Sequence, residues 1–463
     1  MYFYRPMSLK RQDSTHSMCD LHDCDHDRQA RARRASASPT EVDRRTALGL
    51  GGAALASLGL VQFAGSSVPK ASAAPGPLPA EDLDLMVIVC DGMRPDELNA
   101  EQTPTLWRWA TQGTRYSNAK AHMVAETLPS HTAMVTGTYP DRNGVPSNSI
   151  WDHAAGDERT MDRADDITYP TVLERIRTER GLTTASVVSK DYLYTILDGK
   201  ASVHWTPGPL LPVTDHALDH FTVEALKVTI DDHSPRFTFV NLGDIDRFGH
   251  MDFSGTSWRL ARNQALFNTD HKLWELEQFM RANGSWDRTA ILVLADHSMD
   301  WSTPFDLVSA KELTDREPAL RGRFGIAQNG GADTFTYLGA PGDKDAAIAR
   351  LREVVLAHPG VNRVYTGDEL RLGERGGDLV ATCHPGWRFS DPTPVSNPIP
   401  GNHGHEVTLP IPFFIAGGHP SVRRGQVVDR PVTTRDVAAT AAHAFGLSWQ
   451  DMDASPAAEA FTF

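Results

Sequence analysis

Three short apolar runs in this chain are each followed by residue types that bind metal ions. The runs and the residues that follow them are 86–90 with Asp91, 237–242 with Asp246 and His250, and 290–295 with Asp296 and His297. Apolar runs of this length, without polar alternation, are typical of strands covered on both faces of a parallel sheet. The sequence therefore predicts an α/β fold with a central, mostly parallel sheet flanked by helices.

We expect the side chains that follow these strands to lie close together. In an open α/β sheet the carboxyl ends of parallel strands meet at one edge, where such sheets place their ligands. A fourth apolar run, 411–416, is preceded by His403 and His405. A mixed set of carboxylates and imidazoles suits zinc or a similar divalent ion. Taken alone, Asp91 before Gly92 is more typical of an ordinary turn, so only the recurrence indicates a site.

The charge of the chain limits its partners. The 463 residues carry a formal net charge of −14. A nucleic-acid polymer is not an expected partner, because binding it requires clustered Lys and Arg that release counterions. A small phosphate ester held by metals or by a local cationic site is compatible with this charge. The length allows one large α/β unit with an insertion, or two to three domains.

The first 73 residues predict an export signal. Arg44 and Arg45 precede an apolar stretch rich in Gly and Ala at 51–63, and an Ala-x-Ala sequence ends at Ala73. This order resembles a twin-arginine signal, so we expect cleavage after Ala73, the twin-arginine machinery as a partner, and an extracytoplasmic protein that is periplasmic, wall-associated or secreted. The alternatives are a basic tail with a chance apolar helix, an uncleaved signal that acts as an anchor, and a later start such as Met18. No later segment is long enough to span a bilayer.

Strand-like and helix-like stretches alternate up to about position 297, and the pattern then loosens. Beyond it, charged stretches rich in Gly and Pro surround short strand-like runs, which is typical of an insertion. The predicted parts are an export leader at 1–73, a linker at 74–82, an α/β core at 83–297, an inserted cap at 298–400 and the C-terminal part of the core at 401–463. Helices are expected near 103–110, 169–176, 258–282 and 433–446.

Thr127 is the candidate nucleophile. It stands immediately before an expected helix start, with Pro129 in the first turn. A hydroxyl there faces free backbone N–H groups and the positive end of the helix dipole, which favour an anion such as phosphate or an alkoxide. On spacing alone, an ordinary N-cap is the simpler interpretation.

These residues form an ordered set that resembles the alkaline phosphatase superfamily, and most closely its nucleotide pyrophosphatase/phosphodiesterase members. The set is Asp-Gly after the first strand, Thr-x-Pro-Ser-His with Thr-Gly-x-Tyr-Pro, Asp-x3-His, Asp-His and a late Asn-His-Gly. The resemblance spans most of residues 84–450 and is weak through the cap. It implies an alkaline-phosphatase-like fold and a hydrolase of phosphoric esters that acts as a phosphodiesterase or nucleotide pyrophosphatase.

The resemblance also implies roles for single residues. The metal ligands would be Asp246, His250 and His403 for one ion, and Asp91, Thr127, Asp296 and His297 for the other, with zinc as the usual ion. Thr127 is a poor nucleophile until a metal makes it an alkoxide, and two metals would stabilise the attacking and leaving oxygens. A phosphothreonine would form and then be hydrolysed. Asn148 and the backbone N–H next to Thr127 would hold the phosphoryl oxygens.

Two positions in the set have competitors. His405 lies close to His403, but His403 holds the His-Gly position of the family. Asp244 lies close to Asp246, but only Asp246 keeps the spacing to His250. Ser298 and Asn143 depart from the family pattern without removing a ligand.

The substrate is the least constrained part of this interpretation. Lys190-Asp191-Tyr192 resembles the Lys-Asp-Lys segment with which phosphonoacetate hydrolases of the same superfamily grip the substrate carboxylate. Lys190 is therefore a candidate for substrate binding, although Tyr192 replaces the second lysine and a solvated lysine at a helix start is the alternative. Asn148, rather than a bidentate Arg, as oxygen donor favours monoanionic diesters. Phosphonoacetate or phosphomonoester hydrolysis are alternatives within the superfamily, and a non-catalytic secreted metal-binding protein is the alternative outside it.

Overall fold

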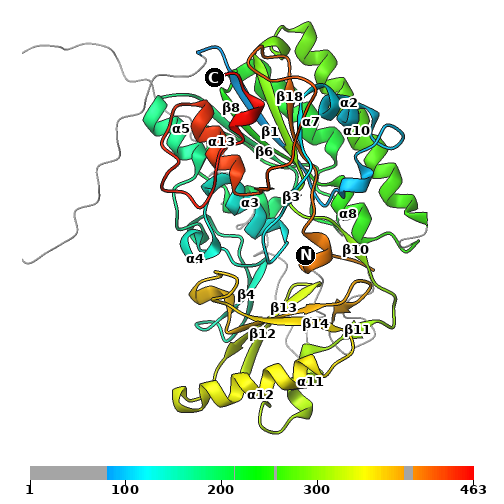
Figure 1. Ribbon diagram of the computed structural model, residues 1–463, viewed down its shortest axis with the longest axis vertical. Helices are drawn as coiled ribbons and strands as arrows, with labels where there is room; N and C mark the ends of the chain where they lie inside the picture. The colour runs from blue at the N-terminus through cyan, green and yellow to red at the C-terminus, as the bar shows by residue number, and fades with distance from the viewer. Residues whose placement is uncertain (1–80, 213, 255–257, 391–399) are drawn as a thin grey trace, which may run out of the picture. The chain divides into compact units, whose positions relative to one another are not determined.

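The computed structural model describes residues 81–463 except 213, 255–257 and 391–399. The export leader predicted at 1–73 lies outside the described residues. The described residues fall within one unit, which is built around an eight-stranded sheet (Figure 1). Within them, no helix combines the length and the apolar composition that crossing a bilayer requires.

The central sheet confirms the predicted α/β class. Its strands, in spatial order, are β19 (Gln426–Val428), β2 (Thr114–Tyr116), β18 (Phe413–Gly417), β9 (Thr289–Leu294), β1 (Asp84–Cys90), β8 (Phe237–Leu242), β6 (Thr184–Val188) and β7 (Val203–Trp205). The run from β9 to β7 is parallel throughout, as the unbroken apolar strands predict. All seven residues of β1 are buried, because the sheet is covered on both faces.

Strand β18 departs from a purely parallel sheet. It pairs antiparallel with β9 on one side and with β2 on the other. Because its direction is reversed, its amino end lies at the edge where the parallel strands have their carboxyl ends. This geometry explains how residues that precede β18 in the sequence reach residues that follow β1 and β9.

Helices flank the sheet on two sides (Figure 1). One side carries α2 (Pro104–Gln112), α7 (Asp219–His233) and α10 (Leu260–Ala282), and the other α3 (Thr127–Thr136), α5 (Val172–Arg180) and α13 (Asp436–Ala444). The four helices expected from the sequence correspond to α2, α5, α10 and α13. Helix α5 begins three residues after the expected start at 169, because a capping box fixes its first turn: Thr171 Oγ1 accepts from the backbone N–H of Glu174, and the Glu174 carboxylate accepts from the backbone N–H of Thr171.

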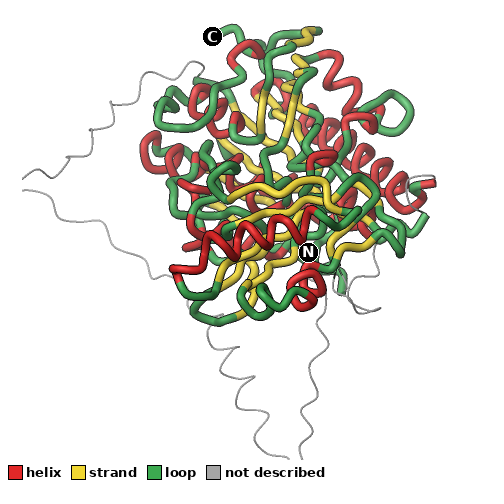
Figure 2. Tube along the Cα trace, turned by 60° about the horizontal axis from the view of Figure 1, so that its bottom comes forward, coloured by secondary structure: helices red, strands yellow, loops and turns green. Residues whose placement is uncertain are grey.

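A second, smaller sheet forms in the region that follows the Asp296-His297 pair. Its antiparallel strands are β12 (Phe324–Gln328), β13 (Ala332–Tyr337), β15 (Leu379–Cys383) and β14 (Val361–Thr366), accompanied by α11 (Ala310–Arg316) and α12 (Lys344–Leu356). It has its own core, which includes Phe335, Leu351 and Leu379. Figure 2 brings this sheet and its helices to the front. The boundaries of the cap at 298 and 400 stay a prediction.

Candidate active site

The candidate residues lie at one edge of the central sheet because four neighbouring strands end there. Asp91 follows β1, Asp296 and His297 follow β9, and Lys190 follows β6 and precedes α6 (Asp191–Ile196), while α8 (Asp244–His250) follows β8 and carries Asp246 and His250. His403 comes from the segment after β17 (Gly401–Asn402), ahead of β18. The structure thus brings together all seven predicted metal ligands and Lys190, and every one of them is at most 5% exposed.

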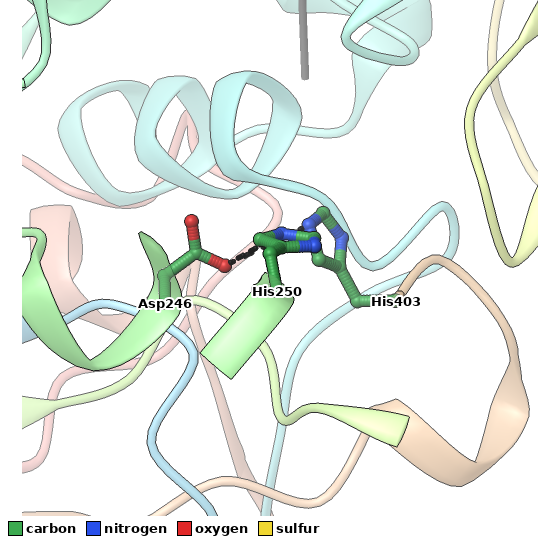
Figure 3. Close-up of side chains that lie close together, drawn as sticks. All are labelled: Asp246, His250 and His403. Atoms are coloured by element: carbon green, nitrogen blue, oxygen red, sulfur yellow. Dashed lines mark ion pairs between the residues drawn. The ribbon is translucent and has the colours of Figure 1, made fainter. Parts of the chain in front are cut away.

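The first predicted ligand group is compact. Asp246 and His250 stand four residues apart on α8, which places them on one face of the helix. His250 Nε2 lies 3.0 Å from Asp246 Oδ1, and His403 Nε2 lies 3.9 Å from the same oxygen. Figure 3 shows the two imidazoles and the carboxylate gathered from α8 and from the loop that follows β17.

The second predicted group surrounds Thr127. His297 Nε2 lies 3.3 Å from Thr127 Oγ1, 3.3 Å from Asp296 Oδ2 and 3.8 Å from Asp91 Oδ1. The two groups adjoin, because the rings of His297 and His403 stack with their centroids 3.6 Å apart. Asp91, Asp246 and His297 also lie close enough together to share an ion.

The tautomers of the three predicted imidazole ligands suit a metal. His250 Nδ1 lies 2.7 Å from the Gly401 carbonyl, His403 Nδ1 3.1 Å from the Ala125 carbonyl, and His297 Nδ1 2.9 Å from the Ser298 carbonyl. A carbonyl accepts only, so each Nδ1 carries the proton and each Nε2 presents a lone pair. Burial lowers the pKa of all three rings, which keeps them neutral.

The carboxylates show the same need for a cation. Asp91 Oδ1, Asp246 Oδ1 and Asp296 Oδ2 are buried without a hydrogen-bond donor. Leaving a buried carboxylate oxygen unpaired is costly, and a divalent ion relieves that cost. Burial and the charge of Asp91 raise the pKa of Asp296 to about 7. The buried Asp and His clusters therefore fit the two-metal site of the predicted family, and the mixed oxygen and nitrogen donors suit Zn²⁺.

His131 is a neighbour of the clusters rather than a ligand. It lies close to Asp91 and Asp296. Its Nδ1 bonds the Thr127 carbonyl at 2.8 Å, and its Nε2 accepts from Asn241 Nδ2 at 3.0 Å. With both ring nitrogens engaged, His131 has no lone pair left for an ion.

Lys190 lies between the two groups. Its Nζ is 2.8 Å from both Asp91 Oδ2 and Asp246 Oδ2, and it donates to Thr127 Oγ1 at 3.3 Å. Burial alone would lower the pKa of Lys190, but Asp246 and Asp91 outweigh burial and raise it, so the amine stays charged. The alternative of a solvated lysine is wrong, because Lys190 is fully buried, whereas its expected place at a helix start is confirmed, since it holds the N-cap position of α6.

Thr127 is the first residue of α3 rather than its N-cap. Glu126 holds the N-cap position, so the simpler interpretation of Thr127 as an N-cap is wrong by one residue. Asn148 Oδ1 accepts from the Leu128 backbone N–H at 2.8 Å. The backbone N–H expected to hold a phosphoryl oxygen is therefore engaged by Asn148 in this structure.

The two competing residues, Asp244 and His405, make polar contacts to residues other than the predicted ligands. Asp244 Oδ1 lies 3.0 Å from His216 Nε2 and accepts from the Asp219 backbone, away from the ligands. His405 Nε2 lies 3.1 Å from Asp300 Oδ2. These contacts agree with the choice of Asp246 and His403.

Sequence reasoning missed several buried polar residues around the site. Asn241, in the middle of the apolar strand β8, donates to Asp91 Oδ2 at 2.7 Å and to His131. Glu126 accepts from the Asn148 backbone at 2.6 Å, and burial raises its pKa to about 8. A lone amide within an apolar strand is a usable signal for Asn241. Arg247, next to Asp246, gave no such signal, because single arginines on short helices are common.

Comparisons with known proteins agree with this geometry. Residues 85–405 match the family described as type I phosphodiesterase / nucleotide pyrophosphatase. The chain is 21% identical over 388 residues to bis(5'-adenosyl)-triphosphatase enpp4 of Mus musculus, which covers 78% of this chain and 77% of the relative. It is 21% identical over 251 residues to the Homo sapiens protein of that name, and this match covers 50% of this chain and 51% of the relative.

Solved structures share the fold. Murine ectonucleotide pyrophosphatase / phosphodiesterase 5 superposes with a TM-score of 0.66 at 16% identity, covering 80% of this chain and 97% of the other. Phosphonoacetate hydrolase from Sinorhizobium meliloti, in complex with phosphonoacetate, superposes with a TM-score of 0.63 at 18% identity, covering 81% and 100%. With the family match extending over most of the chain, this protein belongs to the type I phosphodiesterase / nucleotide pyrophosphatase family of hydrolases, within the alkaline phosphatase superfamily.

Proposed function

We propose that the protein is an exported two-metal phosphoric-ester hydrolase, a phosphodiesterase or nucleotide pyrophosphatase that acts through a phosphothreonine on Thr127. One observation carries this proposal: Thr127 Oγ1 lies 3.3 Å from both Lys190 Nζ and His297 Nε2 at the start of α3, beside carboxylate oxygens that lack donors. Asp246, His250 and His403 would hold one ion, and Asp91, Asp296 and His297 would hold the other together with Thr127.

Each residue of the site would have its own role in the reaction. When bound, two divalent ions act as Lewis acids and lower the pKa of a coordinated hydroxyl. Thr127 Oγ passes its proton to solvent water and attacks phosphorus, and the bond from phosphorus to the leaving oxygen breaks, so that this oxygen departs as an alkoxide or takes up a proton from solvent. Water then attacks phosphorus and releases one proton, the bond to Thr127 Oγ breaks, and Thr127 Oγ takes up a proton. Lys190 stabilises the charged Thr127 oxygen by donating to it, and Asn148 binds a phosphoryl oxygen.

The test is a substrate panel on the protein loaded with zinc. The panel contains bis(4-nitrophenyl) phosphate, 4-nitrophenyl phosphate, a nucleotide pyrophosphate and phosphonoacetate. We expect kcat/KM to be highest for the diester or the pyrophosphate, since ratios of kcat/KM report transition-state preference. Preference for phosphonoacetate would favour the second candidate, which Lys190 and the structural likeness to phosphonoacetate hydrolase support.

Replacing the nucleophile tests the covalent step. Thr127→Ala should lower kcat for the preferred substrate at least about 10³-fold, because no oxygen remains to attack phosphorus. Thr111→Ala, an exposed threonine on α2, is the matched control and should keep full activity. An unchanged kcat in Thr127→Ala would exclude a phosphothreonine. Absence of both bound metal and hydrolysis in the unaltered protein would instead favour a non-catalytic metal-binding protein.

We also propose export by the twin-arginine route. The paired Arg44 and Arg45, the apolar stretch at 51–63 and the Ala-x-Ala ending at Ala73 support it. Replacing both arginines by lysine should leave the protein in the cytoplasm, which cell fractionation and immunoblotting would reveal. Unaltered export of that variant would contradict this route.

A further inference from the structure

Arg247 is a buried cation without a partner in the described part of the chain. Its side chain lies on α8 between the predicted ligands Asp246 and His250 and is 4% exposed. Its Nε is buried and has no acceptor. No carboxylate oxygen of the described residues comes within ion-pair distance of its guanidinium. An unpaired buried charge costs several kcal/mol or more, so a charge left in this state points to a partner that binds from outside.

A second buried arginine, Arg262, has a structural role and differs from Arg247 in its hydrogen bonds. Arg262, on α10, is also fully buried. Its guanidinium donates to both carboxylate oxygens of Glu97, to the Ile245 carbonyl at 3.1 Å and to the Gly92 carbonyl at 2.6 Å. Arg262 thus makes four side-chain hydrogen bonds to the protein, whereas Arg247 makes none to any residue that the structure describes.

The position of Arg247 links it to the candidate active site. Arg247 Cζ lies 5.5 Å from the centroid of the Tyr192 ring, and Lys190 Nζ lies 5.9 Å from the same centroid. Lys190 in turn contacts Thr127 Oγ1. Arg247 and Lys190 thus contact the same Tyr192 ring, and Lys190 connects that ring to the candidate nucleophile.

Arg247 carries a positive charge at this position. An arginine guanidinium remains protonated in proteins. The cation–π contact with Tyr192 holds the side chain in place without using its N–H groups. No described residue accepts from these donors, so they remain available for a bidentate acceptor such as a carboxylate or a phosphate.

We propose that Arg247 binds a second anionic group of the substrate, a carboxylate or a phosphate that lies beyond the reacting phosphoryl group, and so determines specificity for doubly anionic esters. This inference rests on the proposed function, which supplies the reacting phosphoryl group at Thr127. Arg247 adds a cation that the sequence did not place at the site, and it comes from α8 rather than from the Lys190 segment.

The test uses substrates that differ only in the distal group. The 4-nitrophenyl phosphodiesters with a butyl, a 3-carboxypropyl or a 3-phosphopropyl second ester group share one leaving group, 4-nitrophenol. We expect the unaltered protein to have a kcat/KM about 10- to 100-fold higher for the better of the two anionic diesters than for the butyl diester, the range for a charge-assisted hydrogen-bonded pair. Which anionic diester is preferred distinguishes a carboxylate from a phosphate.

Variants then assign the preference to Arg247. Arg247→Met should lower kcat/KM for the preferred anionic diester about 10- to 100-fold more than for the butyl diester, while Arg247→Lys should keep part of the preference. Arg316→Met, an exposed arginine on α11, is the matched control. No preference in the unaltered protein, or equal losses on all three diesters in Arg247→Met, would overturn the inference. Hydrolysis of the butyl diester without a preference would leave the proposed function standing.

A binding measurement keeps the inference testable if hydrolysis fails. The Thr127→Ala protein, loaded with zinc, is titrated calorimetrically with 3-phosphonopropionate and with propylphosphonate, which differ only in the carboxylate. We expect about 10-fold or tighter binding of 3-phosphonopropionate, lost in Thr127→Ala/Arg247→Met. Equal binding of the two ligands, together with no preference for the phosphate-bearing diester, would overturn the inference.

Discussion

Asn241 acts on the site at the scale of one side chain. Its amide donates to Asp91 at 2.7 Å and to His131 at 3.0 Å, and its carbonyl accepts from Ser189 at 2.7 Å. It therefore fixes the Asp91 carboxylate and the tautomer of His131 at once. Partners of this kind orient metal ligands and set their basicity.

Removing this amide should weaken metal binding. Asn241→Leu keeps the volume of the side chain but no longer holds Asp91, so we expect the zinc affinity to fall about 10- to 100-fold. Calorimetric zinc titration of the metal-free protein measures the effect. Asn263→Leu, at an exposed amide of α10, should bind zinc as the unaltered protein does. Equal affinities in the two variants would show that Asp91 does not depend on Asn241.

At the scale of elements, hydrogen bonds connect the first residues of α7 and α8. Asp219 begins α7 and Asp244 begins α8, and each accepts a hydrogen bond from the backbone N–H of the other, at 3.1 and 3.2 Å. Thr269, on α10, donates to Asp219 Oδ2. This reciprocal pair fixes the amino end of α8, the helix that carries Asp246, His250 and Arg247.

The pair should make stability depend on pH. Burial raises the pKa of both carboxyls above the ordinary 3.8, and the charge of Asp244 raises that of Asp219 further. Such groups hold their protons more tightly in the folded chain, so their stabilisation is present below the ordinary pKa and is lost as the pH rises through the folded values. The free energy of unfolding should therefore fall between about pH 5 and pH 8.

The variant Asp219→Asn isolates this contribution. It keeps an acceptor for the Asp244 backbone but cannot ionise, so the fall in unfolding free energy from pH 5 to pH 8, measured by urea denaturation, should be smaller. Asp231→Asn, exposed on the same helix, should leave the fall unchanged. A fall of the same size in Asp219→Asn would assign the pH dependence to other groups.

The elements that the sequence predicted well are those with a strong local signal. Strand β8 matches its expected apolar run, 237–242, residue for residue, and α2 begins within one residue of the start expected at 103. The direction of β18 carried no local signal, because it depends on which neighbours the strand finds. The order of the ligands could be predicted because each ligand follows its own strand in the sequence. The contact of Lys190 with both Asp91 and Asp246 could not, because it depends on which strands become neighbours in the folded sheet.

At the scale of the whole molecule, metal binding should stabilise the fold. Three buried carboxylates keep oxygens without donors in the metal-free chain, so ions that bind only the folded state raise its stability by mass action, about 4 kcal/mol at a thousandfold excess over Kd. We expect chelation to lower Tm by several degrees and zinc to restore it, as measured by calorimetry. Lys190 offsets part of the loss, so the metal-free protein should remain folded.

The response to the chelator should require the ligands. Asp246→Asn lacks a carboxylate of the first group, and its Tm should change less on chelation than that of the unaltered protein. Asp315→Asn, on the exposed surface of α11, should respond as the unaltered protein does. An identical Tm of the unaltered protein with and without chelator would contradict a metal site in these clusters.

The reversed strand β18 and the late position of His403 in the sequence determine when the first ligand group can form during synthesis. His403 is synthesised 153 residues after His250, and so long after Asp246 as well. Strand β18 joins β9 to β2, which belongs to the earliest part of the sheet, and it can do so only at that late time. A chain still being synthesised therefore holds Asp246 and His250 before His403 is in place, and we expect the first ligand group to bind metal only after β18 has joined the sheet.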